Sequence, residues 1–314
     1  MPSLIDIRRR IRAVKSTQQI TKAMKMVAAS RMRRAYDRIV NARPFTKGML
    51  RLMHSLASRV DPSVHPLLAV RDVNAPDARI LLIVVSGDKG LAGSFNSNVI
   101  KMASHFVIDR PGRQITFRIV GRKARDFFRR RGVTIQGEHV GIFSHLSGKD
   151  ALAVTAPAIE AFVSGQVDAV YIVYNEFKSI MTQRTVVEQL LPVPRAALDQ
   201  AMASAVDTQR TSPGYNEDYD RDGRIDPTSK IDYLYEPDAD TIFNELLPRY
   251  VESQILHALL ESNAAFFAAQ MTAMEAATKN SEEMIDSLTL YMNKVRQAAI
   301  TREIIEVVSG AQAQ

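Results

Sequence analysis

A glycine-rich segment is the first candidate for chemistry. Ser86-Gly-Asp-Lys-Gly-Leu-Ala-Gly-Ser94 lies between an apolar β-type run at 79–85 and a helical pattern at 95–108. Phosphate-binding loops of α/β folds occupy this position. A Walker A loop ends in Gly-Lys-Ser/Thr, whereas Lys89 precedes the last two glycines, and the glycine spacing of a dinucleotide fingerprint is also absent. We interpret the segment as a structural turn, and a small nucleotide-using α/β enzyme is an alternative.

An acidic segment is the second candidate. Residues 218–223, Asp-Tyr-Asp-Arg-Asp-Gly, have the spacing of the first half of an EF-hand calcium loop, and Asp226 continues the match. The twelfth position, which should supply a bidentate Glu, is Ser229, and no helical patterns flank the segment. A solvated acidic insertion is the favoured interpretation, and calcium binding is the alternative.

The remaining residue types offer no catalytic constellation. The chain has no cysteine, which excludes thiol catalysis, thiolate metal sites and disulfides. No serine occupies a nucleophile elbow, and the six histidines lack metal-ligand spacing. They are His54, His65, His105, His139, His145 and His257. We therefore predict no catalytic residue, no metal and no cofactor.

The middle of the chain alternates strand and helix patterns. Strands are expected at 79–85, 115–120 and 168–174, separated by helices at 95–108, 122–131 and 151–164. This alternation predicts a largely parallel sheet with right-handed crossovers. Residues 133–140 are expected as a short edge strand, and 182–191 as a strand antiparallel to 168–174. Pro192 and Pro194 end the pattern.

The amino-terminal segment has the seam of a coiled coil. A helix is expected to begin near Ser3, with Asp6 as the acid of a capping box, and to end near Ser58. At about 1.5 Å per residue it would be roughly 80 Å long. Its three-four spacing is typical of a heptad repeat. The seam residues are Leu4, Ile7, Ile11, Val14, Gln18, Thr21, Lys25, Ala28, Met32, Ala35, Ile39, Ala42, Thr46, Met49, Met53, Leu56 and Val60.

The carboxyl-terminal segment has a matching pattern. A helix is expected from Asp240 to about 309–310, with small residues at intervals and a seam further along. The small and apolar positions are Ile255, Ala258, Ala265, Ala269, Ala273 and Ala276, and the seam is Met284, Leu288, Tyr291, Val295 and Ala298. Each seam needs a partner, so the two ends of the chain are expected to pair.

The predicted fold class is α/β, with an antiparallel coiled coil of long N- and C-terminal helices plus a central Rossmann-like α/β domain. We divide the chain into a shaft helix at 1–60, an α/β domain at 77–198, an acidic insertion at 199–230, a last strand and junction at 231–239, and a second shaft helix at 240–314.

Charge is unevenly distributed. The net charge is +7, yet residues 1–60 hold fifteen Lys and Arg against two acids, whereas 207–240 hold ten acids against four bases. A basic helix suits nucleic acid, anionic lipid or an acidic protein surface. No apolar run approaches the ~20 residues that span a bilayer, and residues 1–12 do not form a signal peptide. We expect the chain to stay on the side where it is synthesised.

Four segments resemble one family in the right order. Residues 20–31, Ile-Thr-Lys-Ala-Met-Lys-Met-Val-Ala-Ala-Ser-Arg, and 296–311, Arg-Gln-Ala-Ala-Ile-Thr-Arg-Glu-Ile-Ile-Glu-Val-Val-Ser-Gly-Ala, are similar to the terminal signatures of the gamma subunit of F-type ATP synthases. The loop at 86–96 and the junction at 232–238 also resemble this family. The likeness covers almost the whole chain.

The resemblance implies a bacterial central-stalk rotor that transmits torque between the membrane c-ring and the catalytic alpha/beta ring. It implies alpha, beta and epsilon subunits and the c-ring as partners, no nucleic acid, and a peripheral position on the cytoplasmic side of the bacterial plasma membrane. The implied ring contacts are Met24, Lys25, Gln270, Arg296, Gln297, Thr301 and Glu303, and the implied contacts of the foot with epsilon and the c-ring are Tyr233, Tyr235 and Glu236.

The chain departs from the family pattern at three positions. Ala92 replaces a usual cysteine, and Phe266 and Gln270 stand where the family usually has an acid and an arginine associated with a catch between shaft and ring. That contact is therefore in doubt here. The alternative function is a basic coiled-coil protein that binds nucleic acid through the arginines of residues 8–59.

Overall fold

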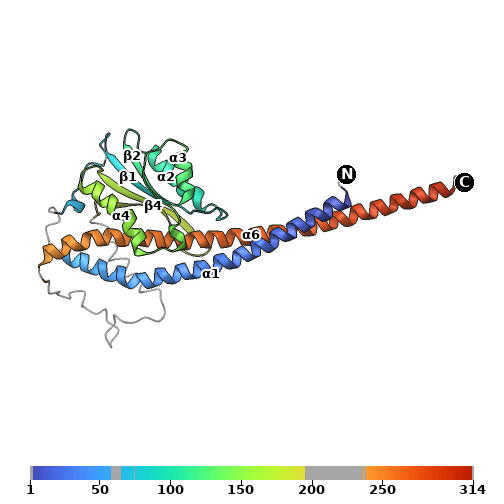
Figure 1. Ribbon diagram of the computed structural model, residues 1–314, viewed down its shortest axis with the longest axis horizontal. Helices are drawn as coiled ribbons and strands as arrows, with labels where there is room; N and C mark the ends of the chain where they lie inside the picture. The colour runs from blue at the N-terminus through green and yellow to red at the C-terminus, as the bar shows by residue number, and fades with distance from the viewer. Residues whose placement is uncertain (1–2, 58–64, 74, 195–235, 237, 313–314) are drawn as a thin grey trace, which may run out of the picture.

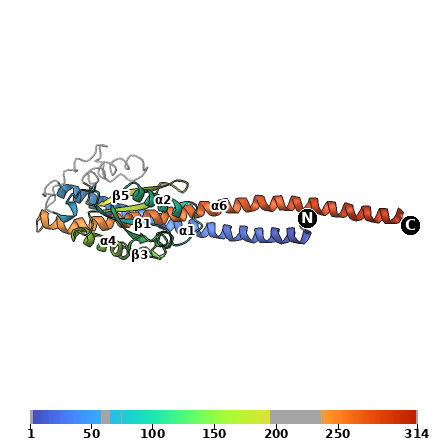
Figure 2. The same ribbon diagram turned by 90° about the horizontal axis from the view of Figure 1, so that it is seen from above.

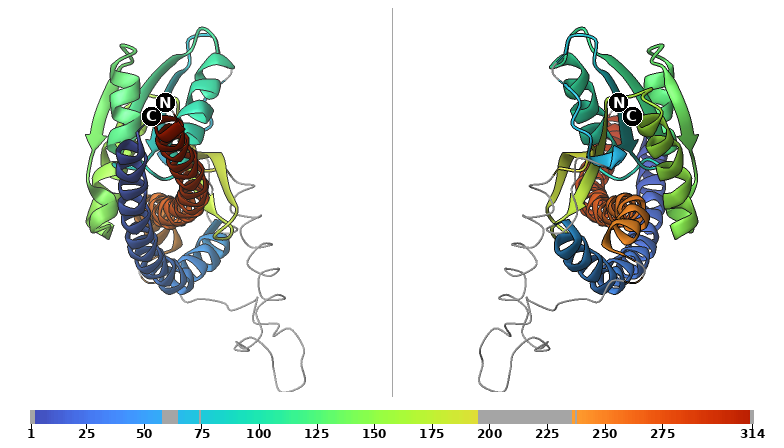
Figure 3. Two further views of the ribbon diagram at one scale, coloured as in Figure 1. Left: turned by 90° about the vertical axis from the view of Figure 1, so that its right-hand side faces the viewer. Right: turned by 90° about the vertical axis from the view of Figure 1, so that its left-hand side faces the viewer.

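The computed structural model describes residues 3–57, 65–73, 75–194, 236 and 238–312. Two long helices lie side by side and form a rod, and a sheet domain packs against one flank of the rod near one end (Figure 1). The amino terminus lies part-way along the rod, and the carboxyl terminus lies at its far tip (Figure 2). Viewed along the rod, the sheet domain covers one side of the helix pair (Figure 3).

The first helix, α1, spans Leu4–Ala57 and follows the predicted capping box. The Ser3 hydroxyl donates to Asp6 Oδ2 at 2.8 Å, and the Asp6 amide donates to Ser3 Oγ at 3.2 Å. Every predicted seam position that is described is buried or half-buried, from Leu4 to Leu56, while most positions between them are exposed. The heptad prediction for α1 is confirmed, and Val60 lies outside the described residues.

The second long helix, α6, spans Ala239–Gln312 and is 74 residues long. It begins where the sequence indicated and continues past the expected end at 309–310. Part of its predicted seam is wrong: Met284 is 54% exposed, Tyr291 is 41% exposed, and Ala298 is also exposed. Ala276, predicted among the small packing positions, is exposed too. The less exposed row is Ser281, Ile285, Leu288, Met292 and Val295.

The seam of α6 was misread because two neighbouring rows are apolar. Met284 and Ile285 are adjacent, as are Tyr291 and Met292, so either row satisfies a three-four spacing. The position of α1 selects the row that is buried. Spacing alone could not make this choice.

The sheet has the order β3-β2-β1-β4-β5. The first four strands are parallel and β5 runs antiparallel to β4, as predicted. Strand β3 stands at the end of the sheet order and pairs with β2, which confirms the predicted edge strand. The strands are β1 Arg79–Val85, β2 Gln114–Val120, β3 Ile135–His139, β4 Ala169–Phe177 and β5 Gln183–Leu191. The predicted strand at 231–236 lies outside the described residues, except for Glu236.

Two cores hold the layers together. On one face of the sheet, Ile80, Leu82 and Val84 pack with α2 (Phe95–Ile108) and α3 (Arg122–Arg129). On the other face, Leu81 and Ile83 pack with α4 (Gly148–Val163) and both long helices. Strand β1 is buried on both faces, which explains its unbroken apolar sequence. Short 3₁₀ helices occur at Pro66–Leu68 and Ile142–Ser144.

Candidate functional site: the rod and its free end

The two long helices meet through a mixed apolar and polar seam. Thr21 Oγ1 and Thr278 Oγ1 are 2.8 Å apart, and one turn along, Lys25 Nζ lies 2.5 Å from Glu275 Oε1. These contacts join residues more than 240 positions apart in the chain. A polar pair within an apolar seam favours one register, because a shift would leave its hydrogen-bonding groups unpaired.

The register leaves the end of α6 unpaired. Counting along both helices from the Thr21–Thr278 contact brings Leu4 opposite Val295, so residues 296–312 extend beyond α1. Figures 1 and 2 show this single helix projecting past the amino terminus. At 1.5 Å per residue the overhang is about 25 Å long.

The overhang carries exposed aliphatic side chains. They recur at three- and four-residue intervals and therefore share one broad face. Their exposed fractions are Ile300 48%, Ile304 57%, Ile305 58%, Val307 72% and Val308 51%. A contiguous apolar face of this kind marks a surface that is covered by a partner. The sequence motif at 296–311 lies at this end, and only the structure shows that no other helix among the described residues runs beside it.

The ring contacts implied by the sequence fall into two groups along the rod. Met24, Lys25 and Gln270 are half-buried and lie near the polar contacts between the two long helices. The other four lie on the overhang and are exposed: Arg296, Gln297, Thr301 and Glu303. Along α6, 26 positions or roughly 39 Å separate Gln270 from Arg296, the nearest member of the other group. The structure also shows a partner that the sequence did not indicate, because Lys25 pairs with Glu275 of the same chain.

Phe266 belongs to the interior. Its side chain is 5% exposed and its ring centroid lies 5.4 Å from Phe95, 6.1 Å from Phe143 and 5.3 Å from Phe267. A Cβ at Gly87 would lie only 2.6 Å from the Phe266 ring. Phe266 is therefore an aromatic anchor that ties the rod to the glycine-rich loop.

The glycine-rich loop is satisfied by its own side chains. Asp88 Oδ1 accepts from the Arg122 amide at 3.1 Å and its Oδ2 accepts from the Gly141 amide at 3.0 Å. Asn96 Oδ1 accepts from the Gly87 amide at 2.9 Å. Asp88 thus joins this loop to the first residue of α3 and to the segment after β3. This geometry supports a structural turn.

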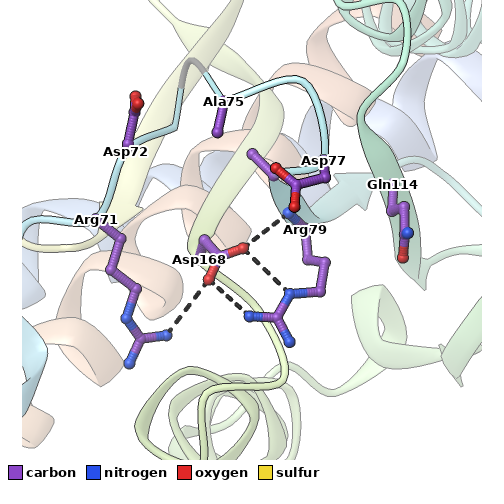
Figure 4. A pocket seen from close by; sticks show the side chains of 8 residues that line it. Arg71, Asp72, Ala75, Asp77, Arg79, Gln114 and Asp168 are labelled. Carbon is purple, nitrogen blue, oxygen red and sulfur yellow. Dashed lines mark hydrogen bonds and ion pairs between the residues drawn. The ribbon is translucent and has the colours of Figure 1, made fainter.

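A pocket of about 420 Å³ opens at the amino-terminal ends of the strands (Figure 4). There Asp168 Oδ2 accepts from the Arg79 amide at 2.9 Å, and Oδ1 accepts from Arg79 Nη2 at 2.9 Å, with Arg71 at 3.9 Å. Burial would raise the pKa of Asp168, but the Arg79 hydrogen bonds hold it below its usual value. These contacts tie the start of β1 to the start of β4.

Within the described ranges, no group of three or more His, Asp or Glu could hold a metal ion, and no helix is long and apolar enough to cross a membrane. The predicted half EF-hand at 218–229 lies outside these ranges, as do Tyr233 and Tyr235. Glu236 is described and exposed.

A family model described as ATP synthase matches residues 3–314. The ATP synthase gamma chain of Solibacter usitatus is 48% identical over 317 residues, covering 100% of this chain and 99% of the relative. This chain belongs to the ATP synthase gamma family. The gamma chain of Chloroherpeton thalassium is 41% identical over 319 residues, covering 100% of this chain and 98% of the relative.

Solved structures share the fold. The central stalk and c-ring structure of Tetrahymena thermophila mitochondrial ATP synthase contains a chain with a TM-score of 0.54 and 25% identity, covering 82% of this chain and 99% of its own length. The rotor of Euglena gracilis mitochondrial ATP synthase gives a TM-score of 0.62 at 19% identity, covering 95% and 98%. As a gamma-family member, the chain is a non-catalytic central-stalk subunit of a membrane-associated complex. The alternative of nucleic-acid binding finds no support in these relatives.

Proposed function

We propose that the helix pair turns inside a ring of alternating alpha and beta subunits, while the α/β domain forms the foot against epsilon and the c-ring. In this proposal residues 1–60 and 240–314 are the shaft, and 77–198 are the body of the foot. The position is the cytoplasmic side of the bacterial plasma membrane, supported by the bacterial relatives.

The single observation that carries the proposal is the overhang of α6. It presents five exposed aliphatic side chains at the one end of the rod that no other described element covers. A sleeve of surrounding subunits would bury this face and hold the tip on the rotation axis. The apolar contact is non-directional, so it centres the tip without fixing one angular position.

The proposed ring contacts on the paired part of the rod suit contacts that form and break during rotation. Met24, Lys25 and Gln270 lie where the rod is a stiff, packed pair of helices. Exposed arginines such as Arg31, Arg33 and Arg34 surround this level and would meet acidic loops of the ring. Surface ion pairs contribute only ~0–1 kcal/mol each, which suits contacts that form and break at every turn. Because the rod has different faces, rotation would favour different conformations of the ring subunits in sequence.

The remaining proposed contacts divide between tip and foot. Arg296, Gln297, Thr301 and Glu303 are exposed on the overhang and would form polar contacts around its apolar face. At the foot, Glu236 is exposed immediately before α6. It would contact epsilon or the c-ring together with Tyr233 and Tyr235.

Truncation tests the role of the tip. Deleting residues 303–314 removes four of the five exposed aliphatic side chains but none of the described seam. We expect weaker co-purification with the alpha and beta subunits and lower rotation-coupled ATPase activity, while the α/β domain stays folded by circular dichroism. Arg302→Ala, an exposed change on the same turn, is the matched control and should assemble normally. Full assembly and coupling without the tip would contradict the proposal, and so would unfolding of the α/β domain.

A further inference from the structure

Helix α4 is apolar on two faces, and only one of them is covered within the described structure. The covered row packs against the sheet and the rod, and its members are Ala151, Val154, Ala158 and Phe162. A second row has the four-three-four spacing of a helix seam, and its members are Leu152, Ala156, Ile159 and Val163. In this open row Leu152 is 50% exposed and Val163 is 49% exposed. Between 151 and 163 the only charged residue is Glu160, whereas the outer face of a surface helix is ordinarily polar.

The open row borders a groove between α4 and the start of α6, which we call the α4 groove. Its volume is about 520 Å³, and all four residues of the open row line it. The residues of α6 that line it are Glu245, Pro248, Arg249 and Glu252. The groove lies near the end of the rod opposite the overhang (Figure 1). Two packed helices with an apolar floor between them form the type of groove that receives the apolar face of a third helix.

Three carboxylates line the α4 groove: Glu160 from α4, and Glu245 and Glu252 from α6. Among the described residues, none of the three forms an ion pair or a side-chain hydrogen bond. Arg249 is the one basic residue that lines the groove, and in the described structure it pairs with neither acid of α6. The groove therefore combines an apolar row with an excess of unpaired negative charge.

This chemistry disfavours a small polar ligand and a lipid surface. Thr155 is the fully buried polar side chain of the lining, and its hydroxyl already donates to the Ala151 carbonyl at 2.7 Å. The buried unpaired polar atoms of the described residues all lie elsewhere, so the groove has no free polar anchor of that kind. Anionic headgroups or fatty acids would meet three carboxylates of the same sign, and this repulsion opposes their binding.

We propose that the α4 groove binds a basic amphipathic helix of another subunit. The apolar face of that helix would cover the open row of α4, and its lysines or arginines would face Glu160, Glu245 and Glu252. Burial of the exposed aliphatic side chains would supply most of the affinity. The charge pairs would orient the helix and exclude acidic competitors. The site does not depend on whether the overhang at the other end of the rod enters a ring.

A titration of the full chain tests the chemistry of the site. The probe is a dye-labelled synthetic peptide as long as α4, with leucine at its a and d positions and lysine at its e and g positions. Its fluorescence anisotropy should rise saturably, and a matched peptide with glutamate in place of lysine should bind at least about tenfold more weakly.

Variants locate the binding on the α4 groove. Leu152→Lys should weaken binding of the lysine peptide by about tenfold or more, because it removes an apolar contact and adds a positive charge. Leu290→Lys is the matched control, since Leu290 is 72% exposed and lies outside the groove, and it should leave the affinity unchanged. Combining Glu160→Gln, Glu245→Gln and Glu252→Gln should weaken binding by roughly three- to tenfold and flatten its dependence on salt.

Photocrosslinking in the assembled complex identifies the natural occupant. Benzoylphenylalanine at Ala156, an exposed position within the open row, should form an adduct with a helix of another subunit that carries lysine or arginine beside an apolar row. An adduct with a second copy of this chain, with lipid or with an acidic segment would overturn the proposal, as would the absence of an adduct. Equal binding by Leu152→Lys and Leu290→Lys, equal binding of the two peptides, or no binding by the wild type would also overturn it.

Discussion

The contact between Gly87 and Phe266 offers a quantitative test of how the rod is attached to the α/β domain. Phe266 comes from α6, and Gly87 comes from the loop after β1, 179 positions earlier in the sequence. Gly87→Ala would place a methyl group 2.6 Å from Phe266 Cε2 and 2.8 Å from Cδ2. Three other phenylalanines surround the ring, so it cannot simply retreat.

The magnitudes follow from burial and overpacking. Phe266→Ala removes a side chain that is 5% exposed, and we expect a loss of about 3–5 kcal/mol in the free energy of unfolding. Gly87→Ala should cost about 1–3 kcal/mol through overpacking. In the double variant the new methyl group occupies space that the ring has left. The loss from Gly87→Ala should therefore disappear or reverse, giving a coupling free energy of about 1–3 kcal/mol.

The assay is urea unfolding of the full chain, followed by circular dichroism for the wild type, both single variants and the double variant. Gly148→Ala is the control, because nothing lies within 4 Å of its Cβ position. It should change stability by less than about 1 kcal/mol. If the two single losses add to the double loss within about 0.5 kcal/mol, the two residues do not share the contact and the reasoning is refuted.

Three further changes test the sheet and the rod. Asp168→Asn should lower the free energy of unfolding by about 1–3 kcal/mol at neutral pH. Because the folded-state pKa of Asp168 is lowered, its carboxylate stabilises the wild type at neutral pH, and this contribution should be lost as the pH falls below about 3.9. Equal pH dependence of stability in the wild type and the variant would contradict the reasoning. Partial burial of the carboxyl raises the pKa of Glu188, although the residue as a whole is exposed and solvent screening reduces the effect on stability. Glu188→Gln should therefore be slightly more stable than the wild type at neutral pH in urea unfolding and should lose this advantage in acid. Cysteines at Thr21 and Thr278 should form a disulfide on oxidation, seen as a gel shift, whereas cysteines at Thr21 and Thr289 should not; the reverse result would refute the register.

Much of the fold was predictable because its signals are local. The heptad spacing of α1 continues over many turns, so every described seam position was identified correctly. The unbroken apolar run of β1 indicated a strand buried on both faces. Four sequence segments also indicate the family without any tertiary information.

The candidate site was less predictable. The resemblance predicts Lys25 as a ring contact, whereas its pairing with Glu275 depends on a helix that lies 250 positions away. Phe266 was associated with a doubtful ring contact, and only the fold showed that it packs against Gly87. For Met284 and Tyr291, two apolar rows competed, and the packing of α1 selected the other one.

The sequence by itself determined that this protein is a long helical pair around an α/β sheet and that it belongs to a rotor family, because periodicity and motifs are properties of neighbouring residues. The tertiary structure alone decided the register at Thr21 and Thr278, the free length of α6 and the contact between Phe266 and Gly87. These features depend on which distant surfaces meet. Burial and charge pairing depend on contacts between residues that are far apart in the sequence, and no local pattern encodes those contacts.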